Sequence, residues 1–351
     1  MRHWGKALFG LAVTVGLLWW ALAGVSFAEV WANVRGGDPL LLLAAVAVAT
    51  FGFVLRAMRW KVLIDPVRPD TKLGSRFASV SIHFMANNLL PLRVGEFARA
   101  WVFARLEPVT ASAAFGSVVV ERFMDGVVLL AFLVIPVLSP GFPDPEALSG
   151  GLFRAAAVAV VGVLLALVAM VAFPRGFVRL AERAAPLLPR ALRDPLLAAL
   201  GAFLRSLAVL RDPRLLAVGF AWSIFFWAYH AVSFWLGMLA FGIDTGYLSA
   251  LFTSSVVGFG VALPSAPGFF GPFHAAVTFA VSDVYGVGEA QSLAFAFAYH
   301  FGGWLPITLI GLGYVWKLGL SLGDVGASEE RVEAEAPPGT QGMPEASETA
   351  S

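Results

Sequence analysis

Residues 87–105 read NNLLPLRVGEFARAWVFAR and lie inside a chain that is otherwise strongly apolar. The segment combines two amides, a proline, a glycine and four charged side chains. Irregular backbone cannot face lipid, because an unpaired N–H or C=O group finds no water there. A charge at the centre of a spanning helix costs about 2.5–3.5 kcal/mol on insertion scales. The segment is therefore either a loop outside the bilayer or a polar site that the protein builds inside it.

The composition of the whole chain identifies the class of protein. Of its 351 residues 59% are hydrophobic and 13% are charged, and the mean hydropathy is +0.80. Soluble domains carry about 25% charged residues. The sequence therefore predicts an all-α, polytopic membrane protein. The chain has no cysteine, which excludes disulfides, thiolate metal sites and cysteine nucleophiles.

Long apolar runs predict about six full spans, since a spanning helix needs about 20 residues. The runs are residues 7–28, 39–58, 113–138, 152–173, 215–241 and 290–318. A cleaved signal peptide is the alternative for the first run, but the run is long for one. The second run ends in Arg56, Arg59, Trp60 and Lys61, a pattern typical of an anchor at the membrane interface.

The distribution of Lys and Arg predicts the topology, because basic loops face the cytoplasm. Under this rule residues 75–105 begin and end inside, and residues 247–283 begin and end outside. Each segment is then a re-entrant helical hairpin, with its turn at residues 87–95 or 264–271. Oppositely oriented hairpins are typical of inverted-repeat transporters. The alternative is a plain bundle of eight or more spans.

The sequence predicts a single transmembrane domain over residues 1–322. Within it, residues 175–214 carry eight arginines and no lysine, which indicates a basic amphipathic segment on the cytoplasmic surface. Residues 323–351 carry seven acids against one base and are expected to form a disordered cytoplasmic tail. The predicted location is the cytoplasmic (inner) membrane, with both termini in the cytoplasm.

A second group of charges lies inside the predicted span 113–138. Glu121 and Asp125 are four residues apart and share one helix face, with Arg122 beside Glu121. Facing lipid, the three groups would cost about 8–10 kcal/mol in total. They must therefore face a partner or water. They are either part of a substrate site or a buried ion-pair network that fixes helix packing.

The opening segment offers further candidates for substrate contact. Arg93, Glu96 and Arg99 follow at three-residue spacing and would line one side of a helix, where an arginine pair suits a phosphate. The alternative is that the arginines mark a cytoplasmic interface. The adjacent amides of Asn87 and Asn88 are also candidate ligands.

Proline and glycine in the two turns predict free backbone groups that form hinges or coordinate a headgroup. The candidates are Pro91, Gly95, Pro264, Pro267, Gly268 and Gly271. The scattered histidines show no metal-ligand spacing, so neither a metal nor another cofactor is expected. Walker, H-E-x-x-H and G-x-S-x-G motifs are absent, which argues against a built-in ATPase or common hydrolase.

Three motifs together resemble the membrane region of lysylphosphatidylglycerol synthases, a family of flippase-like integral membrane proteins that also occur as stand-alone chains. They are residues 87–99, the E-R-x-x-D pattern of residues 121–125 and the P-S-A-P-G-x-x-G pattern of residues 264–271. The resemblance covers most of residues 59–317. In the fused synthases this region is taken to move aminoacylated phospholipid between leaflets. No aminoacyl-transferase domain is expected here, so the resemblance implies lipid translocation without lipid synthesis.

Carried over position by position, the resemblance marks Asn88, Pro91, Arg93, Gly95, Glu96, Arg99, Glu121, Arg122, Asp125, Pro264, Pro267, Gly268 and Gly271. The resulting hypothesis is a non-enzymatic protein that translocates a phospholipid or a polyprenyl-phosphate-linked amphiphile. Arginines would bind the phosphate and carboxylates would balance charge. The alternatives are a transporter of a small polar solute, or a membrane enzyme or partner subunit acting on a lipid or glycan donor. The expected partners are a membrane lipid and a separate lipid- or glycan-modifying enzyme, with no nucleic acid.

Overall fold

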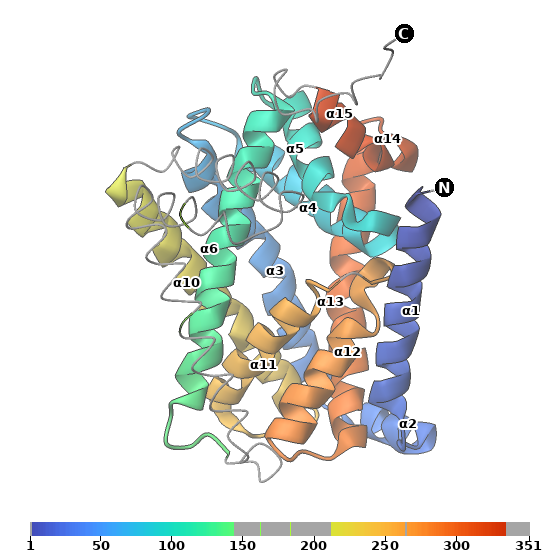
Figure 1. The fold of residues 1–351 in the computed structure, drawn as a ribbon. Helices are drawn as coiled ribbons and strands as arrows, with labels where there is room; N and C mark the ends of the chain where they lie inside the picture. The colour runs from blue at the N-terminus through green and yellow to red at the C-terminus, as the bar shows by residue number, and fades with distance from the viewer. Residues whose placement is uncertain (1, 144–161, 163–182, 184–211, 264, 335–351) are drawn as a thin grey trace.

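The computed structural model describes residues 2–143, 162, 183, 212–263 and 265–334, and every regular element in these parts is a helix (Figure 1). The all-α prediction is confirmed. The predicted span 152–173 and nearly all of the basic segment 175–214 lie outside the described residues. The elements are α1 (Arg2–Leu22), α2 (Phe27–Gly36), α3 (Pro39–Ile64), α4 (Leu73–Leu89), η1 (Pro91–Arg93), α5 (Gly95–Leu106), α6 (Ala111–Val137), α10 (Pro213–Ala240), α11 (Gly246–Gly260), η5 (Pro267–Phe269), α12 (Pro272–Val277), η6 (Thr278–Val284), α13 (Glu289–Lys317), α14 (Leu322–Gly326) and α15 (Ser328–Ala334).

Within the described parts of the chain, three helices, α3, α10 and α13, are long and apolar enough to cross a membrane. The pair α1 and α2 would make a fourth crossing, with an 80° bend between its two parts. Helix α3 has 26 residues, and at 1.5 Å per residue it exceeds the roughly 30 Å hydrocarbon core. Helix α6 is as long, at 27 residues, but carries three charges near its middle. The chain is a multi-pass membrane protein.

Side-chain caps and prolines set where the long helices begin. Asp38 accepts hydrogen bonds from the backbone N–H groups of Leu40 and Leu41, and Pro39 occupies the first turn of α3. Asp212 precedes α10 in the same way. Thr110 caps α6 by accepting from the N–H of Ala113. These oxygens satisfy donors that have no partner within the helix, and proline lacks one of those donors.

Helices α4 and α5 form the first hairpin, close to the expected residues 75–105. The short helix η1 makes its turn and begins at Pro91. After the turn, the N–H of Gly95 donates to Oδ1 of Asn87 at 2.9 Å. A Cβ on Gly95 would lie 2.3 Å from the carbonyl oxygen of His83. The two arms therefore approach as closely as they do because residue 95 is glycine.

Helix α11 and the pair α12–η6 form the second hairpin, where residues 247–283 were expected. The turn between them needs two glycines in the left-handed region, Gly268 at φ 79° and Gly271 at φ 92°. A Cβ on Gly271 would lie 2.7 Å from the carbonyl oxygen of Thr14. Thr14 also accepts a hydrogen bond from the N–H of Ala266 through its Oγ1 at 2.9 Å. The turn is thereby fixed to α1.

The two hairpins come from opposite ends of the molecule and meet at their turns. In Figure 1, α4 and α5 lie in the upper half and α11 and α12 in the lower half. Nη1 of Arg93 donates to the carbonyl oxygen of Ala262 at 2.9 Å, and Nη2 donates to the carbonyl oxygen of Leu263. Arg93 closes η1 with a φ of 56°. The expected pair of oppositely oriented hairpins is present, with their tips in contact.

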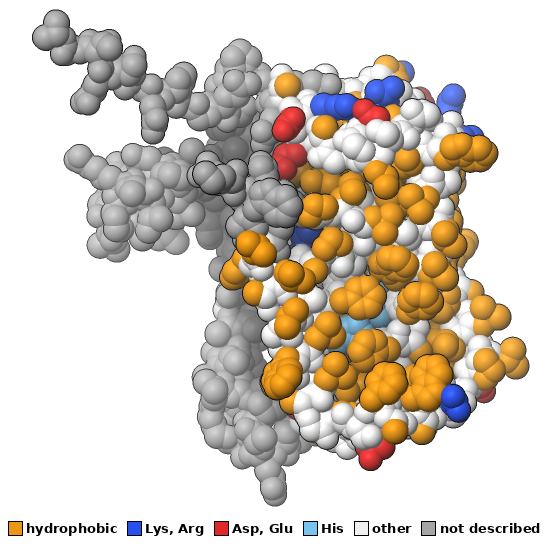
Figure 2. Space-filling view, turned by 90° about the vertical axis from the view of Figure 1, so that its right-hand side faces the viewer, with side chains coloured by type: hydrophobic (Ala, Val, Ile, Leu, Met, Phe, Trp, Pro, Cys, Tyr) orange, Lys and Arg blue, Asp and Glu red, His pale blue; other side chains and the backbone are white. Residues whose placement is uncertain are grey.

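The outside of the molecule carries a wide apolar band. Figure 2 shows hydrophobic side chains over the middle of one face, with charged side chains gathered toward its two ends. Large apolar side chains are strongly exposed, among them Trp19, Leu40, Phe301, Leu309 and Trp316. A contiguous surface of this kind is stable in lipid and not in water.

The chain after Gly323 differs from the expected disordered tail. Helices α14 and α15 continue the fold to Ala334, and α15 packs against α5. Val325 and Val332 are buried there. The guanidinium of Arg331 lies 4.5 Å from the ring centre of Trp101 and bonds Asp324. The acidic composition of this segment did not indicate that two of its valines pack against an apolar surface.

Candidate functional site

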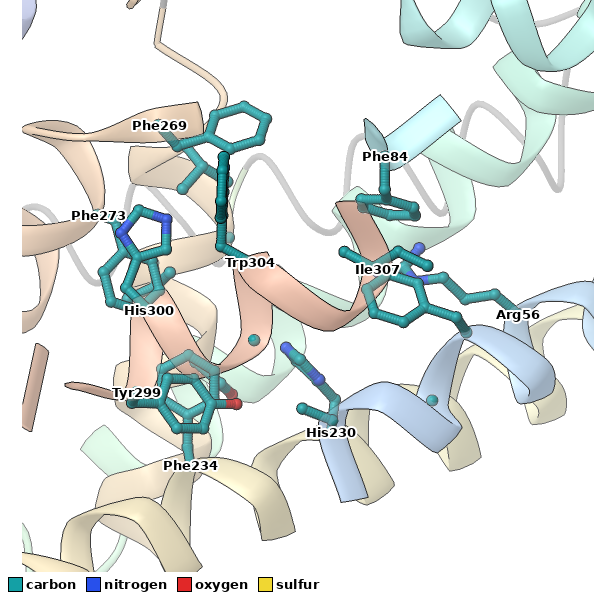
Figure 3. A pocket seen from close by; sticks show the side chains of 18 of the residues that line it. Arg56, Phe84, His230, Phe234, Phe269, Phe273, Tyr299, His300, Trp304 and Ile307 are labelled. Atoms are coloured by element: carbon teal, nitrogen blue, oxygen red, sulfur yellow. The ribbon is translucent and has the colours of Figure 1, made fainter. Parts of the chain in front are cut away.

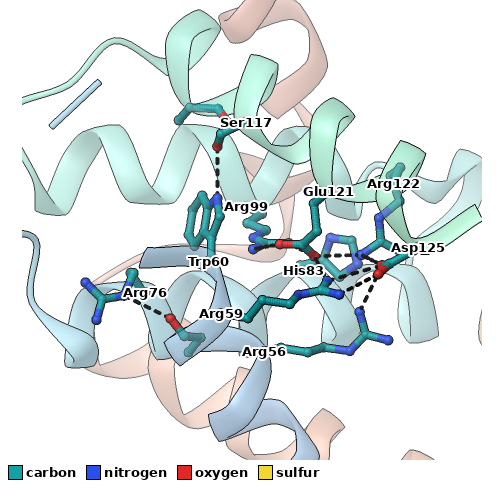
Figure 4. Close-up of polar contacts among 12 residues, drawn as sticks. Arg56, Arg59, Trp60, Arg76, His83, Arg99, Ser117, Glu121, Arg122 and Asp125 are labelled. Atoms are coloured by element: carbon teal, nitrogen blue, oxygen red, sulfur yellow. Dashed lines mark hydrogen bonds and ion pairs between the residues drawn. The ribbon is translucent and has the colours of Figure 1, made fainter. Parts of the chain in front are cut away.

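A cluster of buried charges lies where α3, α5, α6 and α10 converge (Figure 4). Glu121 is fully buried. Both of its oxygens accept from Arg99, at 2.9 and 2.8 Å, in the forked geometry that guanidinium and carboxylate groups favour. Arg59 adds a further contact to Glu121 at 2.9 Å. The acid is therefore held by two arginines from two other helices.

Asp125 is the second acid of the cluster and faces the same interior. Its oxygens accept from both terminal nitrogens of Arg59, at 2.5 and 3.2 Å. Nε1 of Trp227 donates to it at 2.9 Å. Arg59 thus bridges the two acids, and it also donates to Ser223 on α10. The prediction that Glu121 and Asp125 share one interior face is confirmed.

Arg122 and Glu96 lie at the rim of the cluster. Nη2 of Arg122 is 3.1 Å from Glu121 and 3.8 Å from Asp125, and its side chain keeps 37% of its exposure. Glu96 lies 3.9 Å from Nε2 of His83 and 3.5 Å from the amide of Asn87. These two groups are the members of the cluster that remain accessible from outside.

Arg56 and Arg59 were expected to anchor the end of a span at the interface, and this prediction is wrong. Arg59 is fully buried and Arg56 is 6% exposed. A buried carboxylate needs a buried cation beside it. Glu121 and Asp125 therefore draw both arginines into the interior.

The cluster holds more positive than negative charge. Four guanidinium groups, those of Arg56, Arg59, Arg99 and Arg122, surround the two carboxylates of α6. Counting Glu96 at the rim still leaves one cation in excess. A charge that is buried and only partly compensated is costly in free energy. Among the described residues, the cluster therefore has an excess of one positive charge.

Arg99 and Arg93 do not form the expected phosphate-binding pair. Besides its fork on Glu121, Arg99 stacks at 3.9 Å on the ring of Trp60. Arg93 bonds carbonyls of the other hairpin instead. The positive φ of Arg93 breaks the helical spacing that would have placed the two side by side.

The two amides of the opening segment link structural parts. Oδ1 of Asn87 accepts from Gly95, as described above. Nδ2 of Asn88 donates to Oγ1 of Thr308 on α13 at 2.8 Å. Of the predicted hinge residues, Pro91 and Pro267 start η1 and η5, Gly95 starts α5 directly after the first turn, and Gly268 and Gly271 occupy the second turn. Pro264 lies outside the described residues.

A cavity of about 200 Å³ lies between the hairpins and the long helices (Figure 3). Phe84 and Asn88 line it from the first hairpin, and Val261, Phe269 and Phe273 from the second. Helices α3, α10 and α13 complete the wall with Arg56, Phe226, Trp227, His230, Phe234, Tyr299, His300 and Trp304, among others. Arg56 belongs both to this wall and to the charged cluster, so the cavity adjoins the cluster.

The described residues contain no group of three or more His, Asp or Glu side chains that could hold a metal ion. The site itself is built of guanidinium, carboxylate, amide and aromatic groups. Those groups bind and orient polar molecules.

Comparison with known protein families identifies the chain. The lysylphosphatidylglycerol synthase TM region family matches residues 7–311. The chain belongs to this family. The match spans most of the first helix, both hairpins, the charged cluster and most of α13. The resemblance read from the three motifs is confirmed.

Two curated relatives match smaller parts of this chain. The glycosyltransferase AglD of Haloferax volcanii is 27% identical over 154 residues, which is 44% of this chain and 24% of the relative. A UPF0104 membrane protein of Methanocaldococcus jannaschii is 28% identical over 102 residues, 28% of this chain and 30% of the relative. Each match spans less than a third of the relative.

Several residues of the buried charged cluster were not predicted as site residues from the sequence. Arg56 and Arg59 are three residues apart on α3, which places both on one face, and this spacing was the available signal. Ser223 and Trp227 are four apart on α10, but a serine and a tryptophan in an apolar span carry no such signal. Their role follows only from the packing of α10 against α3.

Proposed function

We propose that this family member moves a lipid between the leaflets of the membrane, with the headgroup passing where the two hairpin tips meet. The observation that carries the proposal is the tip-to-tip contact of Arg93 with Ala262 and Leu263, beside a cavity and a buried charged cluster. Broken helices that meet inside a membrane are where transporters bind substrate. The cavity supplies polar contacts for a headgroup, and the apolar band of Figure 2 leaves the acyl chains in lipid.

Arg122 and Glu96 are proposed as the first groups that a headgroup meets. Both lie at the rim of the cluster, and the side chain of Arg122 is 37% exposed. Arg99, Glu121 and Asp125 are proposed to hold the side chains of the charged cluster in position. Asn87 and Asn88 are proposed to position the first tip through their bonds to Gly95 and Thr308.

The proposed location is the cytoplasmic membrane, with both ends of the described chain facing the cytoplasm. Figure 1 places the start of α1 and helices α14 and α15 at the same end of the molecule. Arg2, Lys6, Lys61, Arg68 and Lys72 belong to basic segments, which favour the cytoplasmic side. A separate enzyme that makes or uses the lipid is the proposed partner.

The test is lipid translocation in proteoliposomes that carry a fluorescent headgroup-labelled phospholipid. Added dithionite bleaches only the outer leaflet, so translocation appears as a second bleaching phase. The wild type is expected to bleach the inner pool, and Glu121→Gln and Arg93→Ala to do so at least about tenfold more slowly. Vesicles with folded wild-type protein that behave like protein-free vesicles would show the proposal to be wrong.

A small polar solute is the competing substrate, and the same vesicles separate the two functions. Vesicles loaded with radiolabelled glycerol 3-phosphate or lysine report solute movement. Lipid translocation without solute efflux supports the proposal. Solute efflux without lipid translocation supports a solute transporter.

A further inference from the structure

Among the described residues that line the cavity, one carries a fixed charge, and this charge is positive. Arg56 supplies this charge, and neither Asp nor Glu is among the described residues that line the cavity. The remaining polar groups are one amide, one serine, one tyrosine hydroxyl, two imidazoles and two indoles. A cationic ligand would therefore find no carboxylate within the cavity.

Arg56 itself lacks a good partner in the protein. Its side chain is 8% exposed, and Nη1 has no hydrogen-bond acceptor among the described residues. The carboxylate nearest to it, that of Asp125, is 3.8 Å away and already accepts from Arg59 and Trp227. A buried arginine with an unused donor is stabilised strongly by an anion that reaches it.

Two further unused donors or acceptors lie across the cavity from Arg56. Nδ1 of His300 and Nε1 of Trp304 are buried without a hydrogen-bond partner. Figure 3 shows both side chains on the side of the cavity opposite Arg56. The indole N–H is a donor only. A bound group with acceptor atoms at both ends would satisfy nitrogens on both walls.

Aromatic walls also bind cations, so the ring positions decide between the two charges. The rings of Phe226, Phe84 and Trp227 lie 4.2, 5.2 and 5.3 Å from the guanidinium carbon of Arg56. These faces already hold a cation. A second cation would enter against the repulsion of the first in a site of low polarity.

We infer that this cavity binds an anionic headgroup, a phosphate ester that carries a polyol or sugar, with Arg56 as its counterion. The inference rests on the proposed function and names its substrate class: an anionic phospholipid or glycan phosphate, and not a cationic aminoacylated lipid. The cavity, at about 200 Å³, is several times the roughly 30 Å³ of one water molecule. It is smaller than the ~300–1,000 Å³ of common ligand pockets, so it accommodates a headgroup and leaves the chains outside.

The test measures binding of soluble short-chain lipids to the full chain in detergent, by tryptophan fluorescence. The probes are dihexanoyl phosphatidylglycerol, phosphatidylcholine and lysyl-phosphatidylglycerol, with glycerol 3-phosphate as the lipid-free phosphate. Phosphatidylglycerol is expected to bind about ten- to hundredfold more tightly than the other two lipids, the range of one charge-assisted hydrogen bond. Glycerol 3-phosphate binding that Arg56→Gln also abolishes would support an anion site that does not require acyl chains.

Arg56→Gln is expected to bring phosphatidylglycerol down to the affinity of phosphatidylcholine. A second pair of variants tests the cavity without changing a charge. Gly303 lines the cavity and Gly313 does not, both lie on α13, and a Cβ at either meets nothing within 4 Å. Gly303→Leu is expected to weaken phosphatidylglycerol binding at least about tenfold, whereas Gly313→Leu leaves it unchanged.

Two results would overturn the inference. One is lysyl-phosphatidylglycerol that binds as tightly as phosphatidylglycerol. The other is full phosphatidylglycerol affinity in folded Arg56→Gln or, where that variant does not fold, in Gly303→Leu. The proposed function can fail separately. Selective anion binding without lipid movement refutes translocation and leaves the anion site standing. Equally fast movement of anionic and cationic lipids, unchanged in Gly303→Leu, refutes the anion site and leaves translocation standing.

Discussion

The guanidinium of Arg93 donates a 2.9 Å hydrogen bond to the carbonyl oxygen of Ala262, and this contact joins residues 169 positions apart. Each residue lies in the turn of one hairpin. Irregular backbone within a membrane leaves carbonyl oxygens without partners unless the protein supplies them. Arg93 satisfies two such oxygens at once.

Arg93→Ala is expected to loosen the contact between the tips and to lower stability by about 1–3 kcal/mol, because two carbonyls lose a charged donor. Arg35→Ala is the matched control, since Arg35 is exposed at the end of α2 and stacks only on Trp31. Thermal unfolding in detergent micelles measures both variants. Equal unfolding temperatures for the two would contradict a bonding role for Arg93.

Glu121→Gln is expected to cost about 3–5 kcal/mol, because it leaves buried arginines without their carboxylate. Asp65→Asn provides the contrast. Asp65 pairs with Lys61 at 2.6 Å, but the two side chains are 33% and 43% exposed. Loss of such a surface pair costs about 0–1 kcal/mol. The free energy of unfolding in mixed micelles distinguishes them, and similar losses would mean that the cluster contributes little to stability.

Gly95→Ala is expected to destabilise the first hairpin by about 1–3 kcal/mol, since its Cβ would lie 2.3 Å from the carbonyl oxygen of His83. Gly74, in the first turn of α4, has open space at the same position. Gly74→Ala should therefore raise stability by about 0.5–1 kcal/mol. The sign of the two changes is the readout. A stabilising Gly95→Ala would show that the arms separate easily.

The docking of α14 and α15 is expected to weaken in strong acid. Hydrogen bonds from Ser321, and then from Arg331, lower the pKa of Asp324 below its usual 3.8. A carboxyl group with a lowered pKa contributes stability above its ordinary pKa and loses it as the pH falls through the lowered value. Amide hydrogen exchange of residues 322–334 should therefore be constant between pH 7 and about pH 4, once corrected for intrinsic rates, and faster below.

Asp324→Asn should remove that acid dependence, and Glu330→Gln, at an exposed neighbouring position, should retain it. Exchange in the wild type that shows no acceleration below about pH 4 would count against a structural role for the Asp324–Arg331 pair.

The two hairpins could be predicted because their signals are local. Proline and glycine interrupt apolar runs at the turns, and the basic loops restrict where each run begins and ends. The shared face of Glu121 and Asp125 follows from helical periodicity alone. The approximate bounds of the two hairpins and the shared face of the two acids could therefore be predicted from the sequence.

The rest of the site depends on contacts between distant segments. Arg59 meets Asp125 across 66 positions and Ser223 across 164. A cation near the end of an apolar run has the same local appearance whether it meets lipid headgroups or a buried acid. The predicted pairing of Arg93 with Arg99 was wrong for another reason. The left-handed backbone of Arg93 interrupts the helical spacing on which that prediction relied.

Helix α1 contacts the turn of each hairpin, η1 in the first and the segment around Gly271 in the second. Thr14 reaches the turn through the space that Gly271 leaves open, while α15 lies along α5, an arm of the first hairpin. Both hairpins are therefore held at their turns by α1, and the first is also held along one arm by α15. Because α1 contacts both tips, a movement that parts them would also have to displace one of the tips from α1.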